Sequence, residues 1–205
     1  MPEAFSFTPA LAQVLERGKG IGLLGPGPVE DHIEHAQRFA RAVGPAPATL
    51  LDLGSGGGIP GLFLSLLWPS TLVLLVDAMA RRTTFLSQST ADLEISDRCQ
   101  VIQGRAEDLG QASEYRHHFE VVTARSFGSP AVTAECATGF LMAGGRLVVS
   151  EPPTGEKRWP SAALESLGLR YERPDEPFMA VLRQEVVCPA HYPRRPGIPA
   201  KRPLW

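Results

Sequence analysis

Leu50-Leu51-Asp52-Leu53-Gly54-Ser55-Gly56-Gly57-Gly58-Ile59-Pro60-Gly61 is the stretch of the chain that decides its fold. The apolar run that opens it predicts a buried strand, and the apolar segment from Ile59 to Leu67 predicts a helix. Five glycines lie within eight positions at the junction. Such a turn lets an oxygen-rich ligand approach bare backbone amides near the positive end of a helix dipole. The stretch therefore predicts a site for a cofactor that contains a nucleoside.

The glycines by themselves fit two classes of cofactor. Gly56-x-Gly58-x-x-Gly61 satisfies the fingerprint of NAD-dependent oxidoreductases. Asp52-x-Gly54-x-Gly56-x-Gly58 equally satisfies the acidic and glycine pattern of S-adenosylmethionine (SAM) methyltransferases. Asp77 ends the next apolar run, and its carboxylate would accept hydrogen bonds from the ribose hydroxyls of either cofactor. Both classes stay open on these residues, and a glycine turn without a ligand is the less favoured alternative.

The composition narrows the class of protein. A formal net charge of −2 over 205 residues excludes a generally basic coat for nucleic acid but leaves room for a local basic patch. Cys99, Cys136 and Cys188 form no CxxC pair, so we expect neither a disulfide framework nor a metal site, and we expect Cys99 and Cys136 to be buried. The sequence has no secretory signal pattern and no apolar run of membrane-spanning length, so we expect a soluble, cytoplasmic protein.

Regularly alternating apolar runs predict an α/β fold. The strand-like runs fall near 49–53, 71–77, 99–104, 119–124 and 145–150, and the helical patterns near 59–67, 80–93 and 130–142. The strand-like runs lack polar alternation, which is typical of parallel strands covered on both faces. Right-handed crossovers bring the carboxyl ends of such strands to one edge, where ligands of open α/β sheets bind. We therefore predict a Rossmann-like, mostly parallel twisted sheet with helices on both faces.

We expect a single domain, 1–205, with three parts. The first, 1–47, is a helical segment with helices near 8–17, capped by Thr8, and near 29–43. The second, 48–188, is the cofactor-binding core, which includes a short helix over 161–167 and strands near Tyr171 and over 179–187. The third, 189–205, is a basic tail with five prolines, which we expect not to be helical.

Taken together, these motifs resemble the small-subunit ribosomal RNA methyltransferase G family, also called glucose-inhibited division protein B. The resemblance covers nearly the whole chain and is carried by Asp52–Gly61, Arg81-Arg82-x-x-Phe85-Leu86, Gly104–Asp108, Thr123–Phe127, Gly144-Gly145-Arg146 and Tyr192–Pro199. Members of that family methylate N7 of a guanine in 16S ribosomal RNA with SAM. The resemblance implies a class I SAM-dependent methyltransferase fold, SAM as cofactor, and ribosomal RNA or the small ribosomal subunit as partner of a monomeric enzyme.

The resemblance also implies the residues of the site. It places cofactor contacts at Gly54, Ile59, Asp77, Ala106, Glu107 and Arg125, and the glycine loop adds Asp52, Gly56 and Gly58. The candidates for RNA contacts are His35, Arg38, Arg105, Arg125 and the tail residues Arg194 and Arg195. No catalytic base is expected, because guanine N7 carries a lone pair and no proton and needs only alignment with the methyl donor.

The chain departs from the family pattern at three places. Ser150-Glu151-Pro152 stands where many members have Leu-Lys-Gly, and glutamate for lysine reverses the charge offered to RNA. Gly22-Leu23-Leu24-Gly25 replaces an Asn-Leu-Thr element, and Arg38 stands where an aspartate or asparagine follows the family's histidine. Two alternatives thus remain: methylation of another acceptor, or a paralogue that binds SAM or RNA without turnover.

Overall fold

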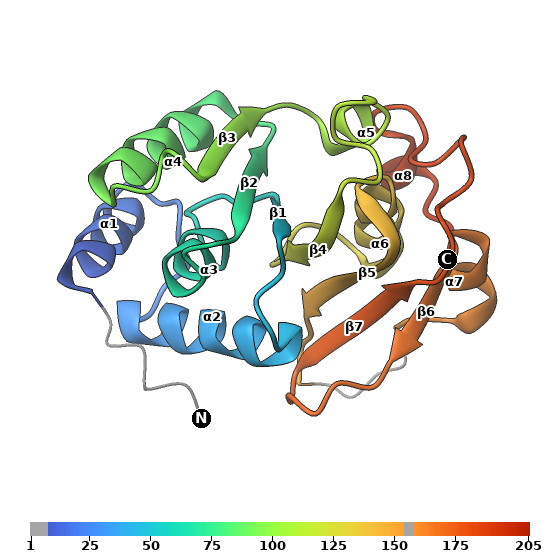
Figure 1. Ribbon diagram of the computed structural model, residues 1–205, viewed down its shortest axis with the longest axis horizontal. Helices are drawn as coiled ribbons and strands as arrows, with labels where there is room; N and C mark the ends of the chain where they lie inside the picture. Colours follow the sequence, from blue (N-terminus) through green and yellow to red (C-terminus); the bar gives the residue numbers. More distant parts are fainter. Residues whose placement is uncertain (1–7, 154–157) are drawn as a thin grey trace.

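The computed structural model describes residues 8–153 and 158–205, and in these residues seven strands form one sheet (Figure 1). The strands are β1 (Thr49–Leu53), β2 (Leu72–Asp77), β3 (Cys99–Gln103), β4 (Phe119–Ala124), β5 (Leu141–Ser150), β6 (Leu169–Glu172) and β7 (Met179–Gln184). Their order is β3-β2-β1-β4-β5-β7-β6. The first five strands are parallel, and β7 runs antiparallel between β5 and β6. The predicted mostly parallel α/β sheet is confirmed.

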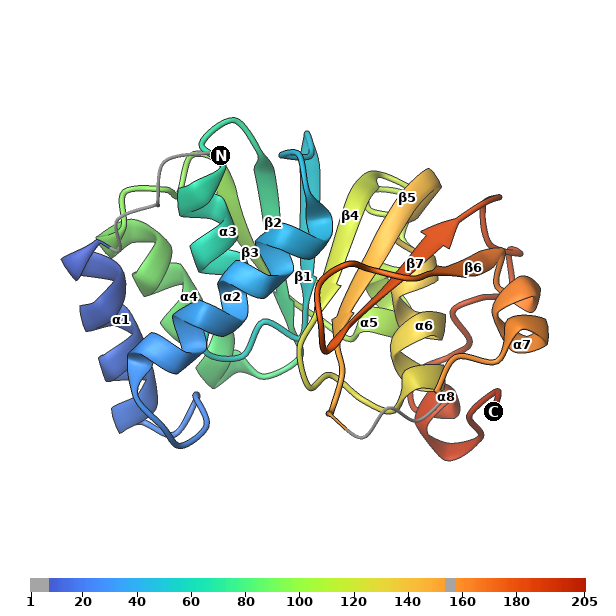
Figure 2. The ribbon, with the colours of Figure 1, turned by 90° about the horizontal axis from the view of Figure 1, so that it is seen from below.

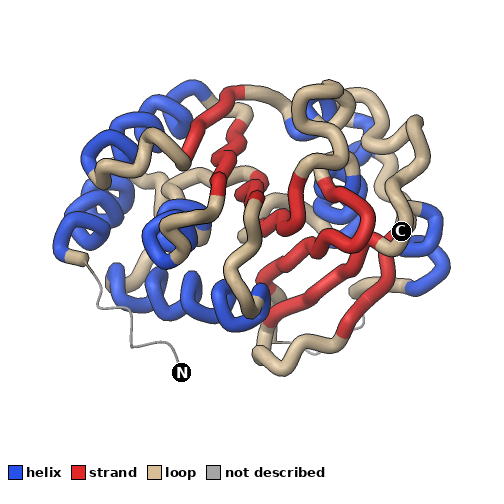
Figure 3. The backbone as a smooth tube through the Cα atoms, in the orientation of Figure 1, coloured by secondary structure: helices blue, strands red, loops and turns tan. Residues whose placement is uncertain are grey.

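Helices cover both faces of this sheet. They are α1 (Pro9–Gly20), α2 (Val29–Val43), α3 (Gly61–Leu67), α4 (Ala80–Asp92), α5 (Ala106–Leu109), α6 (Pro130–Thr138), α7 (Ser161–Ser166) and α8 (Ile198–Lys201). Successive residues of a strand face opposite sides, so Leu50 packs with α1 to α4 while Leu51 packs with α5 to α7. Figure 2 shows these two groups of helices on either side of the sheet, and Figure 3 shows the strands as one band between them.

The strand and helix predictions agree with the structure for most of the core. The helix predicted over 29–43 has these bounds, and Thr8 caps α1 by accepting a hydrogen bond from the amide of Leu11. Cys99 and Cys136 are buried, as expected. The helix predicted over 130–142 instead ends at Thr138, and β5 begins at Leu141, opposite Phe119. Apolar residues at 140–142 satisfy either element, so periodicity alone could not place this boundary.

The prediction that the tail cannot be helical is wrong. Ile198–Lys201 forms the four-residue helix α8, with a proline at the start of its first turn. Proline is tolerated there because its missing N–H would have no partner within the helix. Gly197, with a φ of +79°, supplies the left-handed residue that precedes the turn.

The tail is held against α6 by a buried ion pair. Glu135 is fully buried, and its Oε1 accepts hydrogen bonds from Nε of Arg194 at 2.7 Å and from the amide of Arg194 at 2.9 Å. Nη2 of Arg194 contacts the second carboxylate oxygen. A bidentate arginine is the partner that best offsets the cost of burying a carboxylate.

None of the helices in the described part of the chain has the length and hydropathy needed to cross a bilayer.

Replacing Arg194 by alanine should lower the free energy of unfolding by about 3 kcal/mol, because it leaves the buried carboxylate of Glu135 without its guanidinium. Urea denaturation of the variant measures this loss. Arg195→Ala is the matched control, since Arg195 is the exposed neighbour and its loss should change stability by less than about 0.5 kcal/mol. Equal stabilities of the two variants would contradict the assignment.

Candidate functional site

A cavity of about 570 Å³ lies at the edge of the sheet where β1, β2, β3 and β4 end. We call it the first cavity. Its walls are the turns that follow these strands and the beginning of α6. Five residues that the sequence singled out line this one space, namely Gly54, Asp77, Arg105, Ala106 and Glu107. The carboxyl edge of the sheet, where open α/β folds bind ligands, therefore brings these predicted residues together.

Gly54, the first residue after β1, presents bare backbone to the first cavity. Its φ of +71° is in the left-handed region that side chains disfavour. A Cβ at this position would come within 2.7 Å of Cδ2 of Phe127. The amide of Gly54 donates to the carbonyl of Val76 at 2.8 Å, which fixes the turn against β2. Glycine is therefore required here both by the backbone conformation and by the nearby ring.

The carboxylate of Asp77, at the end of β2, lines the first cavity and holds two neighbouring segments. Its Oδ2 accepts from the amide of Gly56 at 3.1 Å, and its Oδ1 accepts from the amide of Met79 at 2.9 Å. Arg82 Nη1 lies 3.3 Å from Oδ2. Each carboxylate oxygen has two acceptor positions, and Oδ2 has two partners whereas Oδ1 has one, so Asp77 keeps one position, on Oδ1, for a hydroxyl group of a ligand.

Asp52, Gly58 and Ile59 are buried and support the glycine turn from behind. Asp52 Oδ2 accepts from the amide of Gly61 at 3.2 Å, and Oδ1 accepts from the hydroxyl of Thr123 at 2.8 Å. These bonds tie the start of α3 to β4. A direct contact between these three residues and a cofactor stays a prediction, since the walls of the first cavity do not include them.

Ala106 and Glu107 open α5 and form the far wall of the first cavity. Glu107 Oε1 accepts from Nη2 of Arg105 at 2.9 Å and from the amide of Gly197, in the tail, at 2.9 Å. Burial by itself would raise the pKa of Glu107, but the hydrogen bonds from Gly197, Arg105 and its own amide, together with the charge of Arg105, outweigh burial and the pKa lies below its ordinary value. The tail therefore closes this end of the cavity, and Ala200 of α8 is one of its walls.

Arg125, at the end of β4, reaches α2 rather than the first cavity. Its Nη2 lies 2.9 Å from Nδ1 of His32, whose Nε2 lies 3.2 Å from the carbonyl oxygen of Gly25. A carbonyl can only accept, so Nε2 of His32 donates and Nδ1 accepts from Arg125. Nη1 of Arg125 is buried and has no partner among the described residues. Burial lowers the pKa of Arg125, against the opposing effect of Asp52.

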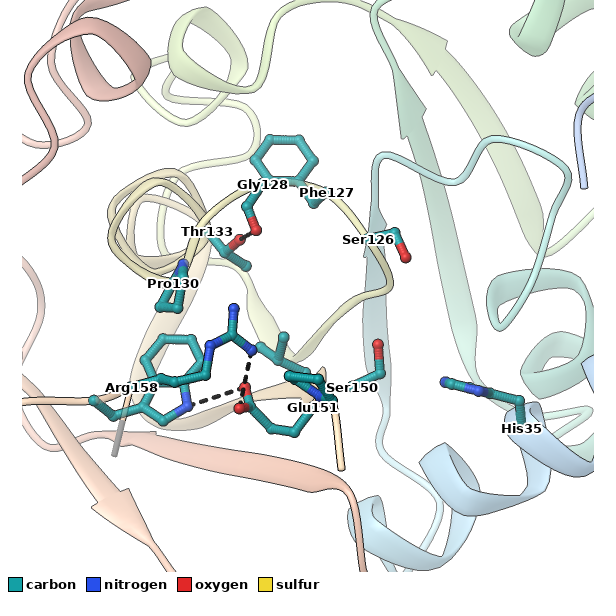
Figure 4. A pocket seen from close by; sticks show the side chains of 12 residues that line it. His35, Ser126, Phe127, Gly128, Pro130, Thr133, Ser150, Glu151 and Arg158 are labelled. Carbon is teal, nitrogen blue, oxygen red and sulfur yellow. Dashed lines mark hydrogen bonds and ion pairs between the residues drawn. The ribbon is translucent and has the colours of Figure 1, made fainter. Parts of the chain in front are cut away.

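A second cavity, of about 340 Å³, adjoins the first across the turn Ser126-Phe127-Gly128, which lines both (Figure 4). Its other walls come from α2, from the start of α6 and from the segments on either side of residues 154–157. In Figure 4, Glu151 lies between Arg158 on one side and His35 on the other.

His35, predicted to contact RNA, lies on a wall of the second cavity as a neutral group. Burial, followed by the charges of Arg125 and Arg38 and the nearby His32, together lower its pKa to about 4. Nε2 of His35 is buried without a partner among the described residues. His35 therefore offers a neutral imidazole at physiological pH, rather than a positive charge for a phosphate.

Glu151 does not present an uncompensated negative charge, as the sequence had suggested. Its Oε2 lies 3.0 Å from Nη1 of Arg158, and its Oε1 accepts from the indole N–H of Trp159 at 3.1 Å. The reversal of charge relative to the family's lysine is thus offset by an arginine seven residues further along the chain.

The remaining candidates for RNA contacts are divided by the structure. Arg194 is committed to Glu135, whereas Arg195 is exposed. Arg105 is half-exposed beside Glu107, and Arg38 pairs with Glu34 at 3.0 Å. Of these groups, Arg195 and Arg105 are the more available to an external phosphate.

Comparison with known proteins gives the family. A model of the family described as rRNA small subunit methyltransferase G matches residues 15–157. The ribosomal RNA small subunit methyltransferase G of Lactococcus lactis subsp. cremoris is 35% identical over 168 residues, which cover 77% of this chain and 70% of that protein. The chain belongs to the rRNA small subunit methyltransferase G family. The protein of the same name from Streptococcus pyogenes is 28% identical over 193 residues, covering 85% and 81% of the two chains.

Solved structures share the fold at lower identity. The cofactor-bound protein Rv0187 from MTB has a TM-score of 0.62 and 16% identity, and the match covers 90% of this chain and 93% of that chain. An O-methyltransferase from Bacillus cereus in complex with SAH has a TM-score of 0.56 and 16% identity, over 73% and 69% of the two chains. The expected class I methyltransferase fold is confirmed. This fold and the family match together show that the chain is a SAM-dependent methyltransferase and not the oxidoreductase that the Gly56–Gly61 pattern had left open.

Sequence reasoning missed the residues that complete the second cavity in this methyltransferase. Arg158 and Trp159 follow the proline-rich break after β5, where no periodic pattern marks them. His32 was missed as the partner of Arg125, although its place one turn of helix before His35 is a signal that both rings share a face of α2.

The stability of the enzyme should depend on the ionisation of Asp52. Burial raises the pKa of Asp52 from an ordinary value of 3.8 to about 6, despite its hydrogen bonds to Thr123 and Gly61. Between these two values the folded chain keeps a proton that the unfolded chain has released, so the free energy of unfolding falls as pH rises. The stability of the parent chain relative to an Asp52→Asn variant should therefore decrease by about 2.4 kcal/mol from pH 4 to pH 7.

Urea denaturation of both chains at a series of pH values measures this difference. The comparison cancels the ionisation of all other groups. A difference that stays constant with pH would contradict the raised pKa of Asp52.

Proposed function

We propose that this enzyme transfers the methyl group of SAM to N7 of a guanine in 16S ribosomal RNA, and that it does so as a monomer. The observation that carries the proposal is the pair of cavities that share the turn Ser126–Gly128. One cavity suits a nucleoside cofactor, and its neighbour suits a planar base. Transfer between two bound groups requires neighbouring sites, and the shared turn makes these two cavities neighbours.

The residues of the first cavity fit SAM. Gly54 presents bare backbone to the cavity, and the carboxylate of Asp77 retains one acceptor position, on Oδ1, for a ribose hydroxyl. Ala106 and Glu107 line the far wall, where backbone and side-chain acceptors suit the adenine amino group. Arg125 lines neither cavity, so its contact with a carboxylate of the cofactor or a phosphate of RNA stays a prediction from the family resemblance. When bound, SAM supplies an activated methyl group on a sulfonium.

The second cavity fits an acceptor that needs no proton removed. Guanine N7 attacks through its lone pair, so the task of the enzyme is to align nitrogen, methyl carbon and sulfur. His35 is neutral at physiological pH and lies half-buried at the cavity wall, where its imidazole can orient an acceptor through a hydrogen bond without adding a positive charge. Because N7 lies in the deep, narrow major groove of A-form RNA, the target guanine belongs to a loop or irregular region.

The proposal is tested by incubating the protein with tritiated SAM and either 16S ribosomal RNA or small ribosomal subunits, followed by mapping of the label. Label at N7 of one guanine supports it. Label at another atom or in another molecule would replace the acceptor while keeping the enzyme class. Tight SAM binding without any label in either substrate would favour the paralogue that binds without turnover.

Asp77→Asn should weaken SAM binding by about tenfold to a hundredfold, because a hydrogen bond to a charged acceptor is worth about 1.5–3 kcal/mol. Titration calorimetry measures the affinity, and thermal unfolding reports whether the turn is intact. Asp92→Asn is the control, since Asp92 makes an exposed ion pair with Arg17 away from the cavity. Unchanged SAM affinity in the Asp77 variant would remove this carboxylate from the cofactor site.

Added salt should separate the two binding events. Contacts from Arg105 and Arg195 to phosphates release counterions, so RNA methylation at subsaturating RNA should fall steeply between 50 and 200 mM salt. SAM affinity should change by less than about twofold over that range, because its site lies within a cavity. Filter binding of RNA and calorimetry of SAM at matched salt concentrations check this, and a parallel loss of both affinities would contradict the division of roles.

A further inference from the structure

The wall of the second cavity that lies away from the first is built from a carboxylate, a guanidinium and an indole. Glu151 follows β5, and Arg158 and Trp159 return to it beyond residues 154–157. The Glu151 carboxylate lies 3.0 Å from Arg158 and 3.1 Å from the indole nitrogen of Trp159. Figure 4 shows the guanidinium of Arg158 beside this carboxylate, on the side of Glu151 toward Pro130 and Thr133.

The two charged groups keep hydrogen-bonding capacity beyond their mutual contact. The side chain of Glu151 is 14% exposed and that of Arg158 is 26% exposed, and both line the cavity. Each oxygen of Glu151 has one partner, and a carboxylate has about four acceptor positions. Arg158 uses one of its five N–H groups on Glu151. The wall thus offers an acceptor directly beside a donor.

This order of groups complements one nucleobase edge. Guanine presents O6 as an acceptor, followed by N1–H and the 2-amino group as donors. Adenine presents a donor followed by an acceptor, so its N1 lone pair would face the carboxylate. We infer that Glu151 accepts hydrogen bonds from N1–H and the 2-amino group of the target guanine while Arg158 donates to O6, which makes this pair the determinant of guanine specificity. The inference rests on the proposed transfer of a methyl group to a guanine.

The recognition leaves the reacting atom unobstructed. N1–H and the 2-amino group lie on the Watson–Crick edge of guanine, whereas N7 lies on the adjacent Hoogsteen edge. A base held by Glu151 and Arg158 therefore keeps N7 free for the shared turn Ser126–Gly128 and the first cavity behind it. The same contacts require that the Watson–Crick edge is unpaired, which agrees with a target in a loop or irregular region.

Inosine in place of the target guanosine tests the inference, because hypoxanthine keeps N7, O6 and N1–H and lacks only the 2-amino group. The position mapped with tritiated SAM is replaced by inosine in RNA joined from synthetic pieces. The parent chain should methylate the inosine RNA with a kcat/KM at least about tenfold lower than guanosine RNA, since an acceptor built to bind an amino group is left unpaired. Glu151→Gln should lose activity on guanosine RNA by about tenfold to a hundredfold and should show little further loss on inosine.

Glu176→Gln is the matched control. Glu176 is 12% exposed and makes a bidentate ion pair with Arg41, outside both cavities, so its variant also loses a paired carboxylate but should keep the parent's preference for guanosine. SAM affinity and thermal unfolding of all three chains verify that they are folded.

The outcomes separate the inference from the proposed function. Equal rates of the parent chain on guanosine and inosine would overturn the inference and leave guanine methylation intact. A Glu151→Gln variant that still discriminates the two bases by the parent's factor would also overturn it, because Glu151 would then serve only to hold Arg158. A parent chain that labels no guanine at all would overturn the proposed function itself.

Discussion

A buried carboxylate between two strands holds the site together. Asp52 sits in the middle of the sheet, and it binds the amide at the start of α3 and the hydroxyl of Thr123 on the neighbouring strand. The glycine turn is fixed at both its ends, because Asp52 accepts from the amide of Gly61 and the carbonyl of Val76 accepts from the amides of Gly54 and Ser55. Without this constraint, a turn so rich in glycine would have many conformations open to it and would lose entropy on ordering. The wall that the proposed function assigns to the cofactor is therefore preorganised by the strands behind it.

Two different sets of elements form the two cavities at the edge of the sheet. The ends of β1, β2 and β3 give the first cavity its polar groups, whereas α2, α6 and the segment after β5 shape the second. The tail belongs to the first set, because the amide of Gly197 binds Glu107 and the side chain of Arg194 anchors the tail to Glu135. Residues distant in sequence thus meet where parallel strands end.

The fold could be predicted because its signals are local. The strands β1 and β2 are apolar runs that end at Gly54 and at Asp77, and α2 repeats apolar residues at helical spacing. The strand-end residues Gly54, Asp77, Ala106 and Glu107 could be placed together for the same reason. The partners of the charged side chains could not be predicted from the sequence. Nothing in the sequence around Glu151 specifies Arg158 as its partner, and nothing around Arg194 specifies Glu135, because such pairs depend on how separate elements approach in space. The partner of Arg125 could not be predicted for the same reason, since its hydrogen bond with His32 arises from the packing of α2 on the sheet.

The turn Ser126-Phe127-Gly128 lines both cavities, whereas every other lining residue belongs to one cavity alone. In the proposed function the second cavity holds the acceptor, so over evolutionary time substitutions at residues that line only this cavity can redirect the enzyme toward a different nucleotide and leave cofactor use intact. Substitutions in the common turn are pleiotropic. We therefore expect the sequences of family members to vary more in the segment after β5 than in the turn Ser126–Gly128, which lines both cavities.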